Sequence, residues 1–320
     1  IYAIPEGTVV FPREPLVKVI APIMQAQLIE TALLNIINHQ SLIATKTERI
    51  VYAAKGDGVM EFGLRRAQGP DAGTYGARAA MIAGCIGTSN VLCGKMFDVP
   101  VKGTHAHSWI MSFPDELTAF RTYAKLYPSA CILLVDTYDT LGSGIPNAIQ
   151  VFKEMREAGI PLTFYGIRLD SGDLAYLSKK AKKMLNEAGF PDAVISASND
   201  LDENLINSLK MQGATINSWG VGTNLITAKD CPSFGGVYKL AAVMDKATGQ
   251  FVPKIKLSEN AEKITNPGNK TIQRIYDRAT GKIIADLICL VGEEFDTRNS
   301  LLLFDPLETW KKTMLAPDSY

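Results

Sequence analysis

The amino-acid sequence predicts an α/β protein whose main domain is a seven-stranded barrel or near-barrel, together with a second, smaller β-rich domain. Between residues 60 and 222, seven short apolar or β-branched runs follow one another, and helical patterns separate most of them. Strands and helices that alternate at roughly 20 to 30 residues are typical of βαβ units in a parallel sheet. After residue 235 the alternation gives way to hairpin patterns. We therefore expect residues 45–234 to form the α/β domain and residues 1–44 and 235–320 to form a discontinuous companion domain.

The N-terminal part combines broken strands with one long helix. Prolines and a glycine interrupt residues 1–20, so only short strand pieces are expected there. By contrast, PIMQAQLIETALLNIINHQ contains no Pro or Gly after its first residue and is rich in helix formers. Residues 22–39 are therefore predicted to form a buried helix that begins at Pro22.

The predicted strands of the α/β domain are recognised by their apolar and β-branched residues. Several of the helical segments between them end in Gly, the usual residue after a helix. A doubly wound open sheet is the alternative arrangement of the same elements. The strands are expected at residues 60–65, 86–90, 102–108, 131–136, 163–168, 193–198 and 216–222. Beyond them, two antiparallel hairpins are predicted to turn at DKATGQ and DRATGK.

Composition excludes several classes of function. The 33 basic and 33 acidic residues cancel, which argues against a nucleic-acid or membrane-surface binder. The five cysteines are odd in number and form no C-x-x-C pair, so free thiols in a reducing compartment are expected. No run approaches the roughly 20 apolar residues that cross a bilayer, and the N-terminus lacks the features of a signal peptide. We expect a cytoplasmic protein, and, because the chain opens without Met inside a predicted strand, a piece of a longer one.

Polar residues follow every predicted strand of the α/β domain. In a parallel α/β barrel the carboxyl ends of the strands open on one face, where reactive side chains collect. A single polar residue at such a place is most often a helix cap, but the whole set brings Arg, His and Asp to one rim. The set is Arg65, Arg66, Thr88, Ser89, Asn90, His105, His107, Ser108, Asp136, Asp139, Arg168, Asp170, Asp173, Asn199, Asp200, Gly220, Gly222 and Thr223.

Two of these segments suggest an anion site. GVGTN, after the last predicted strand, has glycines that would let backbone N–H groups approach a phosphate. RLDSGD places Arg168 and Asp170 on one side of an extended segment. One of them could hold a phosphate, and the other a ribose hydroxyl or a water bound to Mg²⁺.

His105 and His107 account for two of the three histidines in the chain. At positions i and i+2 of a predicted strand they would face one side. Three roles are open for them: a metal site with Asp136 as third ligand, a phosphate-accepting or acid/base imidazole oriented by that carboxylate, or two core histidines satisfied by the backbone.

The motifs EFGLRRAQGPDAG, GTSN, GTHAHSW, RLDSGDL and GVGTNL occur in this order, and with them the chain resembles the nicotinate phosphoribosyltransferases. That family belongs to the type II phosphoribosyltransferases, with the nicotinamide and quinolinate enzymes as relatives. The resemblance implies an incomplete seven-stranded α/β barrel with a β-rich domain. It also implies transfer of a phosphoribosyl group from phosphoribosyl pyrophosphate to nicotinate in NAD biosynthesis, coupled to ATP hydrolysis through a phosphohistidine, with Mg²⁺ and a homodimeric assembly.

The resemblance assigns roles to individual residues. The phosphate carrier would be His107, oriented by Asp136. Phe62 would lie against the pyridine ring, Arg65 and Arg168 would contact substrate anions, Asp170 and Asp200 would hold ribose hydroxyls, and Gly220, Gly222 and Thr223 would cradle the 5′-phosphate. Family members normally begin with a D-x-Y-type element whose Tyr stacks on the pyridine across the dimer interface. The sequence begins at Ile1, after the place where such an element would stand, and a protein without it is expected to lack one wall of the ring pocket.

Ser89 bears on the choice of substrate. In relatives that take nicotinamide, GTD stands where this chain has GTSN, and its carboxylate lies against the amide. A carboxylate there would repel that of nicotinate at a cost of a few kcal/mol, roughly, if both were poorly solvated. The neutral hydroxyl of Ser89 therefore favours nicotinate.

Other readings of the sequence stay open. A nicotinamide or quinolinate phosphoribosyltransferase, a metal-dependent barrel hydrolase that uses the two histidines, and a homologue that binds a nucleotide without turnover are the alternatives. Lys256, Lys263 and Lys270 could contact phosphates or lie on the hairpin surfaces.

Overall fold

The computed structural model describes residues 1–259, 264, 266–296 and 298–320. They divide into two compact units, here called the barrel unit (Asn35–Gly235) and the β unit (Ile1–Leu34 with Gly236–Tyr320). The boundaries were expected at residues 44/45 and 234/235. The two units divide at 34/35 and 235/236, and the first of these divisions, like the expected one, falls inside the helix α2 (Glu30–Ala54). Lys263 lies outside the described residues. No helix in the described part of the chain is both long and apolar enough to span a bilayer.

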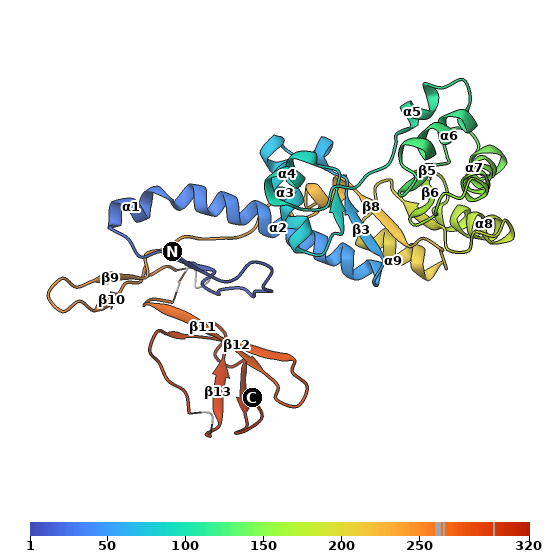
Figure 1. The fold of residues 1–320 in the computed structure, drawn as a ribbon. Helices are drawn as coiled ribbons and strands as arrows, with labels where there is room; N and C mark the ends of the chain where they lie inside the picture. Colours follow the sequence, from blue (N-terminus) through green and yellow to red (C-terminus); the bar gives the residue numbers. More distant parts are fainter. Residues whose placement is uncertain (260–263, 265, 297) are drawn as a thin grey trace. The chain divides into compact units, whose positions relative to one another are not determined.

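The barrel unit contains a curled parallel sheet of six strands in the order β4-β3-β8-β7-β6-β5 (Figure 1). The predicted α/β class is thereby confirmed, and six of the seven expected segments contain a strand. Most of the strand residues are buried, as expected for a parallel sheet covered by helices. The strands are β3 (Gly58–Glu61), β4 (Gly87–Thr88), β5 (Cys131–Leu134), β6 (Tyr165–Leu169), β7 (Val194–Ala197) and β8 (Ser218–Val221).

The strand expected at residues 102–108 was a wrong prediction. Val101 forms an isolated parallel bridge with Thr88, after which the chain leaves the sheet. KGTHAHS contains no Val, Ile or Leu that a doubly covered parallel strand would bury, and its Gly103 adds no packing surface. The sheet consequently stays open between β4 and β5, so the barrel is incomplete.

Helices connect the strands, and several begin with a side-chain cap. The predicted helix at residues 22–39 is present as α1 (Ile23–Leu28) and α2, but the expectation that it is buried is wrong, because each of these residues is exposed or half-buried. α2 continues to Ala54 because Pro and Gly are absent until Gly56. Asp173 caps its helix by accepting from the Tyr176 backbone N–H at 2.9 Å, the ordinary role of a lone polar residue after a strand. The other helices and helical turns are η1 (Leu64–Arg66), α3 (Pro70–Ile82), α4 (Val91–Phe97), α5 (His107–Met111), α6 (Glu116–Leu126), η2 (Thr140–Gly144), α7 (Ile145–Glu157), α8 (Leu174–Glu187), α9 (Glu203–Met211) and α10 (Thr223–Ile226).

The core of the barrel unit packs large aromatic and aliphatic side chains between the sheet and its helices. Phe152 of α7, Tyr165 of β6 and Phe190 form a mutually tilted ring cluster with centroids 5.1 to 6.0 Å apart. Trp219 of β8 is fully buried, and its indole N–H donates to Asp57 at 2.9 Å. This packing holds the strand ends that carry the polar residues in place.

The β unit consists of two-stranded antiparallel sheets. Both predicted hairpins are confirmed, and the same chemistry builds their turns. Asp245 accepts from the backbone N–H groups of Ala247 and Thr248, and Asp277 accepts from that of Thr280. The strands are β1 (Tyr2–Ala3), β2 (Val17–Lys18), β9 (Ala242–Met244), β10 (Phe251–Pro253), β11 (Lys270–Tyr276), β12 (Ile283–Leu290), β13 (Leu301–Phe304) and β14 (Lys312–Leu315).

Candidate active site

Three ionisable side chains meet at the carboxyl ends of β5 and β6. Asp136 follows β5, and Asp170 follows β6. His107 is the first residue of α5, although the sequence predicted that it would lie in a strand. His107 Nε2 lies 3.5 Å from Asp170 Oδ2 and 4.0 Å from Asp136 Oδ1, whereas Nδ1 lies 3.0 Å from the Thr137 hydroxyl. With a proton on Nε2 facing the carboxylates, the imidazole would keep its Nδ1 lone pair for a proton or an electrophile.

Asp136 is the buried member of this cluster and holds the segment that carries Asp170. Its side chain is 1% exposed, and its Oδ2 accepts from the Asp170 backbone N–H and from the Ser171 hydroxyl, both at 2.7 Å. Its Oδ1 has no hydrogen-bond partner among the described residues. An unpaired carboxylate oxygen in a buried place is costly, so Oδ1 is poised for the His107 proton or for a cation.

Arg168 adds a positive charge to the same cluster. It is part of β6, and its guanidinium donates to the Thr104 hydroxyl. Burial lowers the pKa of Arg168, the carboxylates of Asp170 and Asp136 raise it, and the nearby Arg65 lowers it. A guanidinium keeps its proton under these conditions. The cluster therefore pairs fixed positive charge with two carboxylates, a combination suited to a ligand that carries both phosphate and hydroxyl groups.

His105 does not share the site of His107, so the expectation that both imidazoles face one side is wrong. It is 7% exposed, its ring lies edge-on to Tyr123 with centroids 4.5 Å apart, and its Nε2 accepts from the Leu134 backbone N–H at 3.3 Å. Burial, and then the charge of Arg168, lower its pKa to about 4. Of the three roles left open by the sequence, His105 has that of a core histidine: the backbone satisfies Nε2, while Nδ1 has no hydrogen-bond partner among the described residues.

The neutral state of His105 predicts a pH dependence of stability. Its pKa is about 4 in the folded chain against an ordinary 6.5, so the unfolded chain binds the proton more readily. The free energy of unfolding should therefore fall by up to roughly 3 kcal/mol as the pH drops from 6.5 to 4. Chemical denaturation across this range would measure the effect, and a His105→Gln variant should lose that part of the slope. An identical slope in the variant would contradict it.

Phe62 lies against the GVG segment at the end of β8. Its backbone N–H donates to the Val221 carbonyl at 2.8 Å. A side-chain carbon at Gly220 would come within 2.7 Å of the Phe62 ring and 3.6 Å of Ser198 Cβ, and one at Gly222 within 3.2 Å of the Phe62 carbonyl. A side chain at Gly220 would therefore collide with the Phe62 ring, whereas one at Gly222 would make only a tight contact with the Phe62 carbonyl. Because the Ser198 hydroxyl also donates to Asp170, the Phe62 surface and the aspartate cluster are neighbours.

Glu61, which the sequence reasoning missed, ties the ends of β3 and β4 together. It is fully buried, it accepts hydrogen bonds from the Gly63 backbone N–H and from the Thr88 hydroxyl at 2.6 Å, and its carbonyl accepts from Ser89 N–H at 3.0 Å. Burial raises the pKa of Glu61. The available signal was a carboxylate inside the apolar run VMEFG, since a buried acid needs dedicated partners. Through these bonds Glu61 positions Phe62 and the exposed Ser89.

The loop after β7 carries Asp200 in a rarely adopted conformation. Asn199 and Asp200 have φ values of 92° and 39°, in the region that side chains disfavour. The buried Asn224, a second missed residue, donates to the carbonyls of Asp200 at 2.8 Å and Leu201 at 3.0 Å. Thr223 precedes Asn224 as the first residue of α10. The amide of Asn224 thus holds the Asp200 loop against the GVGTN turn.

The sequence-predicted site residues therefore fall into two linked groups on the barrel unit. The first group contains Asp136, Asp170, His107 and Arg168, and the charge of the nearby Arg65 lowers the pKa of Arg168. The second group lies at the ends of β3, β4 and β8 and contains Phe62, Ser89, Gly220, Gly222, Thr223 and the loop with Asp200. Asp139 is not among them, because it caps η2.

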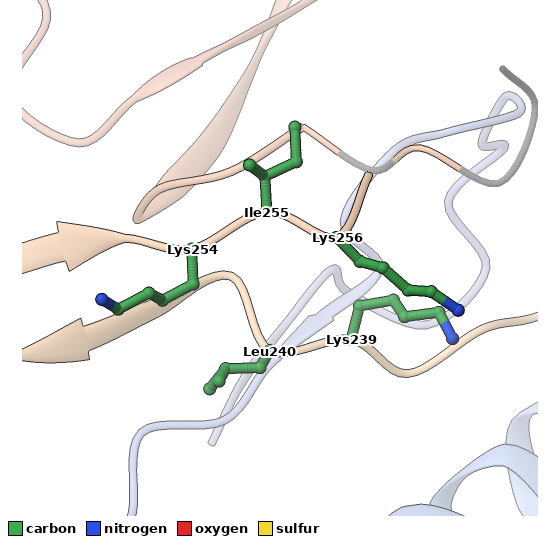
Figure 2. Close-up of a pocket in the computed structure, with 5 residues that line it drawn as sticks. All are labelled: Lys239, Leu240, Lys254, Ile255 and Lys256. Carbon is green, nitrogen blue, oxygen red and sulfur yellow. The ribbon is translucent and has the colours of Figure 1, made fainter. Parts of the chain in front are cut away.

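A cluster of lysines occurs in the β unit. Lys239, Lys254 and Lys256 line a cavity of about 210 Å³ together with Leu240 and Ile255. Figure 2 shows the amines of Lys239 and Lys256 extending toward the same side and that of Lys254 toward the other. Lys270, the first residue of β11, instead donates to the carbonyls of Asn266 and Gly268, which precede it in the sequence. Lys256 is therefore better placed than Lys270 to bind an anion.

The fold and the site define an incomplete α/β barrel with a cluster of charged side chains at the carboxyl ends of its strands. The sequence model of the nicotinate phosphoribosyltransferase (NAPRTase) family matches residues 58–278, and that of the nicotinate phosphoribosyltransferase C-terminal domain matches residues 269–320. The chain belongs to the nicotinate phosphoribosyltransferase family.

Individual relatives agree with this assignment. The chain is 53% identical over 309 residues to nicotinate phosphoribosyltransferase of Bacillus subtilis (strain 168), covering 97% of this chain and 62% of that protein. It is 41% identical over 371 residues to the Dictyostelium discoideum enzyme of the same name, covering 99% of this chain and 62% of that protein. The crystal structure of human nicotinic acid phosphoribosyltransferase superposes with a TM-score of 0.81 at 31% identity, covering 99% of this chain and 69% of that one. The chain thus spans about 62% of the length of these two curated relatives.

The readings as a metal-dependent hydrolase or as a nicotinamide or quinolinate enzyme are not favoured by these matches. Among the described residues, no group of three or more His, Cys, Asp and Glu side chains is arranged to hold a metal ion. The two imidazoles of GTHAHSW turn to different partners, which removes the ligand set that the hydrolase reading required.

Proposed function

We propose that the chain is the catalytic part of a nicotinate phosphoribosyltransferase, which converts nicotinate and phosphoribosyl pyrophosphate into nicotinate mononucleotide and pyrophosphate. The observation that carries the proposal is the convergence of His107, Asp136, Asp170 and Arg168 at the ends of β5 and β6, in a chain of this family. In the reaction, the pyridine nitrogen forms a bond to C1 of the ribose as the bond from C1 to the pyrophosphate oxygen breaks. The nitrogen already has a free lone pair, so the site needs no general base.

The two groups of site residues match the chemistry of the two substrates, nicotinate and phosphoribosyl pyrophosphate. The half-buried Phe62 offers a flat apolar surface to the pyridine ring, and the hydroxyl of Ser89 stands at the adjoining strand end. Arg168 and Arg65 supply positive charge for the anionic groups. Asp170 and Asp200 are acceptors for ribose hydroxyls, and negative charge near C1 would stabilise the cationic character that the sugar develops as pyrophosphate leaves.

Coupling to ATP through His107 is the second part of the proposal. The γ-phosphoryl group of ATP would move to an imidazole nitrogen of His107. The bond between the γ-phosphorus and the bridging oxygen breaks as the P–N bond forms, and ADP leaves with that oxygen. Asp170 and Asp136 face Nε2 and would hold its proton, which leaves Nδ1 as the accepting atom once the Thr137 hydroxyl turns away. A phosphate there adds about 1.5 to 2 negative charges and changes the affinity of the site for pyrophosphate groups.

Magnesium fits the donor set of the site. Asp136 Oδ1, unpaired within the described residues, and the carboxylate of Asp170 are oxygen ligands of the kind that Mg²⁺ takes, directly or through water. A bound Mg²⁺ would neutralise charge on the leaving pyrophosphate. The residues themselves hold the imidazole and orient the ribose. The homodimer and the cytoplasmic location expected from the sequence stay predictions.

The proposal is tested by incubating the purified protein with phosphoribosyl pyrophosphate, Mg²⁺ and one of three acceptors: nicotinate, nicotinamide or quinolinate. Each reaction is run with and without ATP, and mononucleotide and pyrophosphate are quantified. Nicotinate should give the highest kcat/KM, with ATP increasing the rate. A preference for another acceptor would replace the proposed substrate, and binding of nicotinate mononucleotide without turnover would show a binding protein instead.

Replacing Ser89 with Asp is expected to shift selectivity away from nicotinate. The new carboxylate would repel that of nicotinate but not the amide of nicotinamide, so the ratio of the two kcat/KM values should change by roughly tenfold or more. Steady-state kinetics with both acceptors measure this ratio. Ser112→Asp, which adds the same charge to an exposed loop after α5, is the control. Unchanged selectivity in Ser89→Asp would show that this position does not contact the ring substituent.

A further inference from the structure

The open edge of β5 poses a question that the proposed reaction does not answer. In the described part of the chain, β5 has one sheet neighbour, β6. The backbone N–H groups of Cys131 and Val135 donate to carbonyls of Phe164 and Arg168 on the β6 side. Since N–H groups alternate in direction along a strand, that of Leu134 points to the open edge, where a further strand would normally accept it.

A side chain takes the place of the absent acceptor. Leu134 N–H donates to His105 Nε2 at 3.3 Å, and the imidazole ring is fixed by Tyr123 and Phe120 of α6, with ring centroids at 4.5 and 6.1 Å. A neutral imidazole accepts at one nitrogen only when the proton is on the other. The hydrogen bond therefore requires the tautomer with its proton on Nδ1, an atom that has no hydrogen-bond partner among the described residues. Burial and the charges of Arg168 and His107 lower the pKa of this imidazole, and the backbone of Ala106 raises it.

The neighbours of His105 in the sequence contact β6 and the residues that follow β5 and β6. Thr104 accepts from Arg168 of β6, and His107, two residues on, lies against Thr137 and Asp170. Segment 104–107 is thus held at three points in succession, and the bond at its centre is the one made by His105.

We propose that His105 is a positioning residue that replaces a strand at the open edge of β5, through an imidazole protonated on Nδ1, and thereby sets His107 against Asp136 and Asp170. The geometric part of this proposal stands independently of the reaction. Its consequence for catalysis rests on the proposed function.

The test compares two variants of His105. His105→Gln keeps an acceptor oxygen near the position of Nε2, whereas His105→Phe keeps an aromatic ring against Tyr123 but has no acceptor. Hydrogen exchange of the Leu134 amide should be about fivefold to tenfold faster in the Phe variant, the effect of losing one hydrogen bond, and close to wild type in the Gln variant. His39→Gln, which alters an imidazole of α2, is the matched control and should leave this amide unchanged.

Two further measurements keep the outcome decisive. Nitrogen-15 NMR of the unaltered protein should show His105 protonated on Nδ1 and bare on Nε2 at neutral pH, which does not depend on any variant folding. In the assay, the Phe variant should lose the stimulation by ATP, the Gln variant should restore it, and the KM for nicotinate should change in neither. Equal exchange at Leu134 in both variants, or a proton on Nε2, would overturn the proposal. If the protein showed no transferase activity at all, only the proposed function would fail, because the exchange and tautomer results would still decide the role of His105.

Discussion

Replacing His107 with alanine is expected to abolish the stimulation of nicotinate mononucleotide synthesis by ATP while a slower, ATP-independent reaction remains. The imidazole Nε2 lies 3.5 Å from Asp170 and 4.0 Å from Asp136, whereas Phe62, Arg168 and the GVG turn are not altered by the substitution. At saturating ATP the rate should fall by roughly 5- to 150-fold, the range of ordinary coupling between two sites. Initial rates with and without ATP measure the loss.

Two controls separate this effect from unfolding. His39→Ala removes an imidazole from α2 and should leave the ATP effect intact. Phosphate incorporated from γ-labelled ATP should be found in the unaltered protein, with the acid lability of a P–N bond, and should be absent from His107→Ala. ATP stimulation of the same size in His107→Ala would refute the role of this residue as phosphoryl carrier.

Replacing Gly144 with alanine is expected to cause a large loss of stability. An added Cβ would lie 1.9 Å from the carbonyl oxygen of Val135, which is backbone and cannot move aside without displacing the end of β5. The φ of Gly144 is −56°, an ordinary helical value, so the cost comes from the collision and not from backbone strain. We expect a loss of about 3 kcal/mol or more in the free energy of unfolding, at the upper end for overpacked cores.

Denaturant unfolding followed by tryptophan fluorescence measures this loss, because Trp219 is fully buried in the same unit. Gly235→Ala is the matched control, since an added Cβ there meets nothing within 4 Å. Asp136 directly follows Val135, so any Gly144→Ala protein that folds should also show a weakened site. A midpoint of unfolding equal to that of the control would contradict the predicted collision.

The strands were predictable because burial on both faces of a parallel sheet selects continuous apolar runs such as CILL. The same rule explains the failure at residues 102–108, which were predicted to be one of the apolar or β-branched runs although KGTHAHS contains no Val, Ile or Leu to bury. The hairpins were predictable from turn chemistry, since Asp at the first position and Gly near the end define both turns.

The site was predictable in part for the same kind of reason. Polar residues directly after apolar strands must lie at the carboxyl edge, and this placed Asp136, Asp170 and Arg168 together without knowledge of any contact. The partners of the two histidines depend on χ angles and on residues about 30 positions away, such as Leu134 and Thr137, which spacing alone does not encode. Glu61 and Asn224 were missed because each has a partner more than 20 residues away, the Thr88 hydroxyl for Glu61 and the Asp200 carbonyl for Asn224.

The order of strands in the sheet has a consequence for how the protein is made. β3, the first strand of the barrel unit, pairs with β8, the last, with Gly58 opposite Ser218. This contact can therefore form only after nearly the whole barrel unit has been synthesised. Closing so long a loop is also slow. The face that Phe62 and Gly220 share is consequently assembled late, and a polypeptide that stops before β8 would expose the edge of β3 to aggregation.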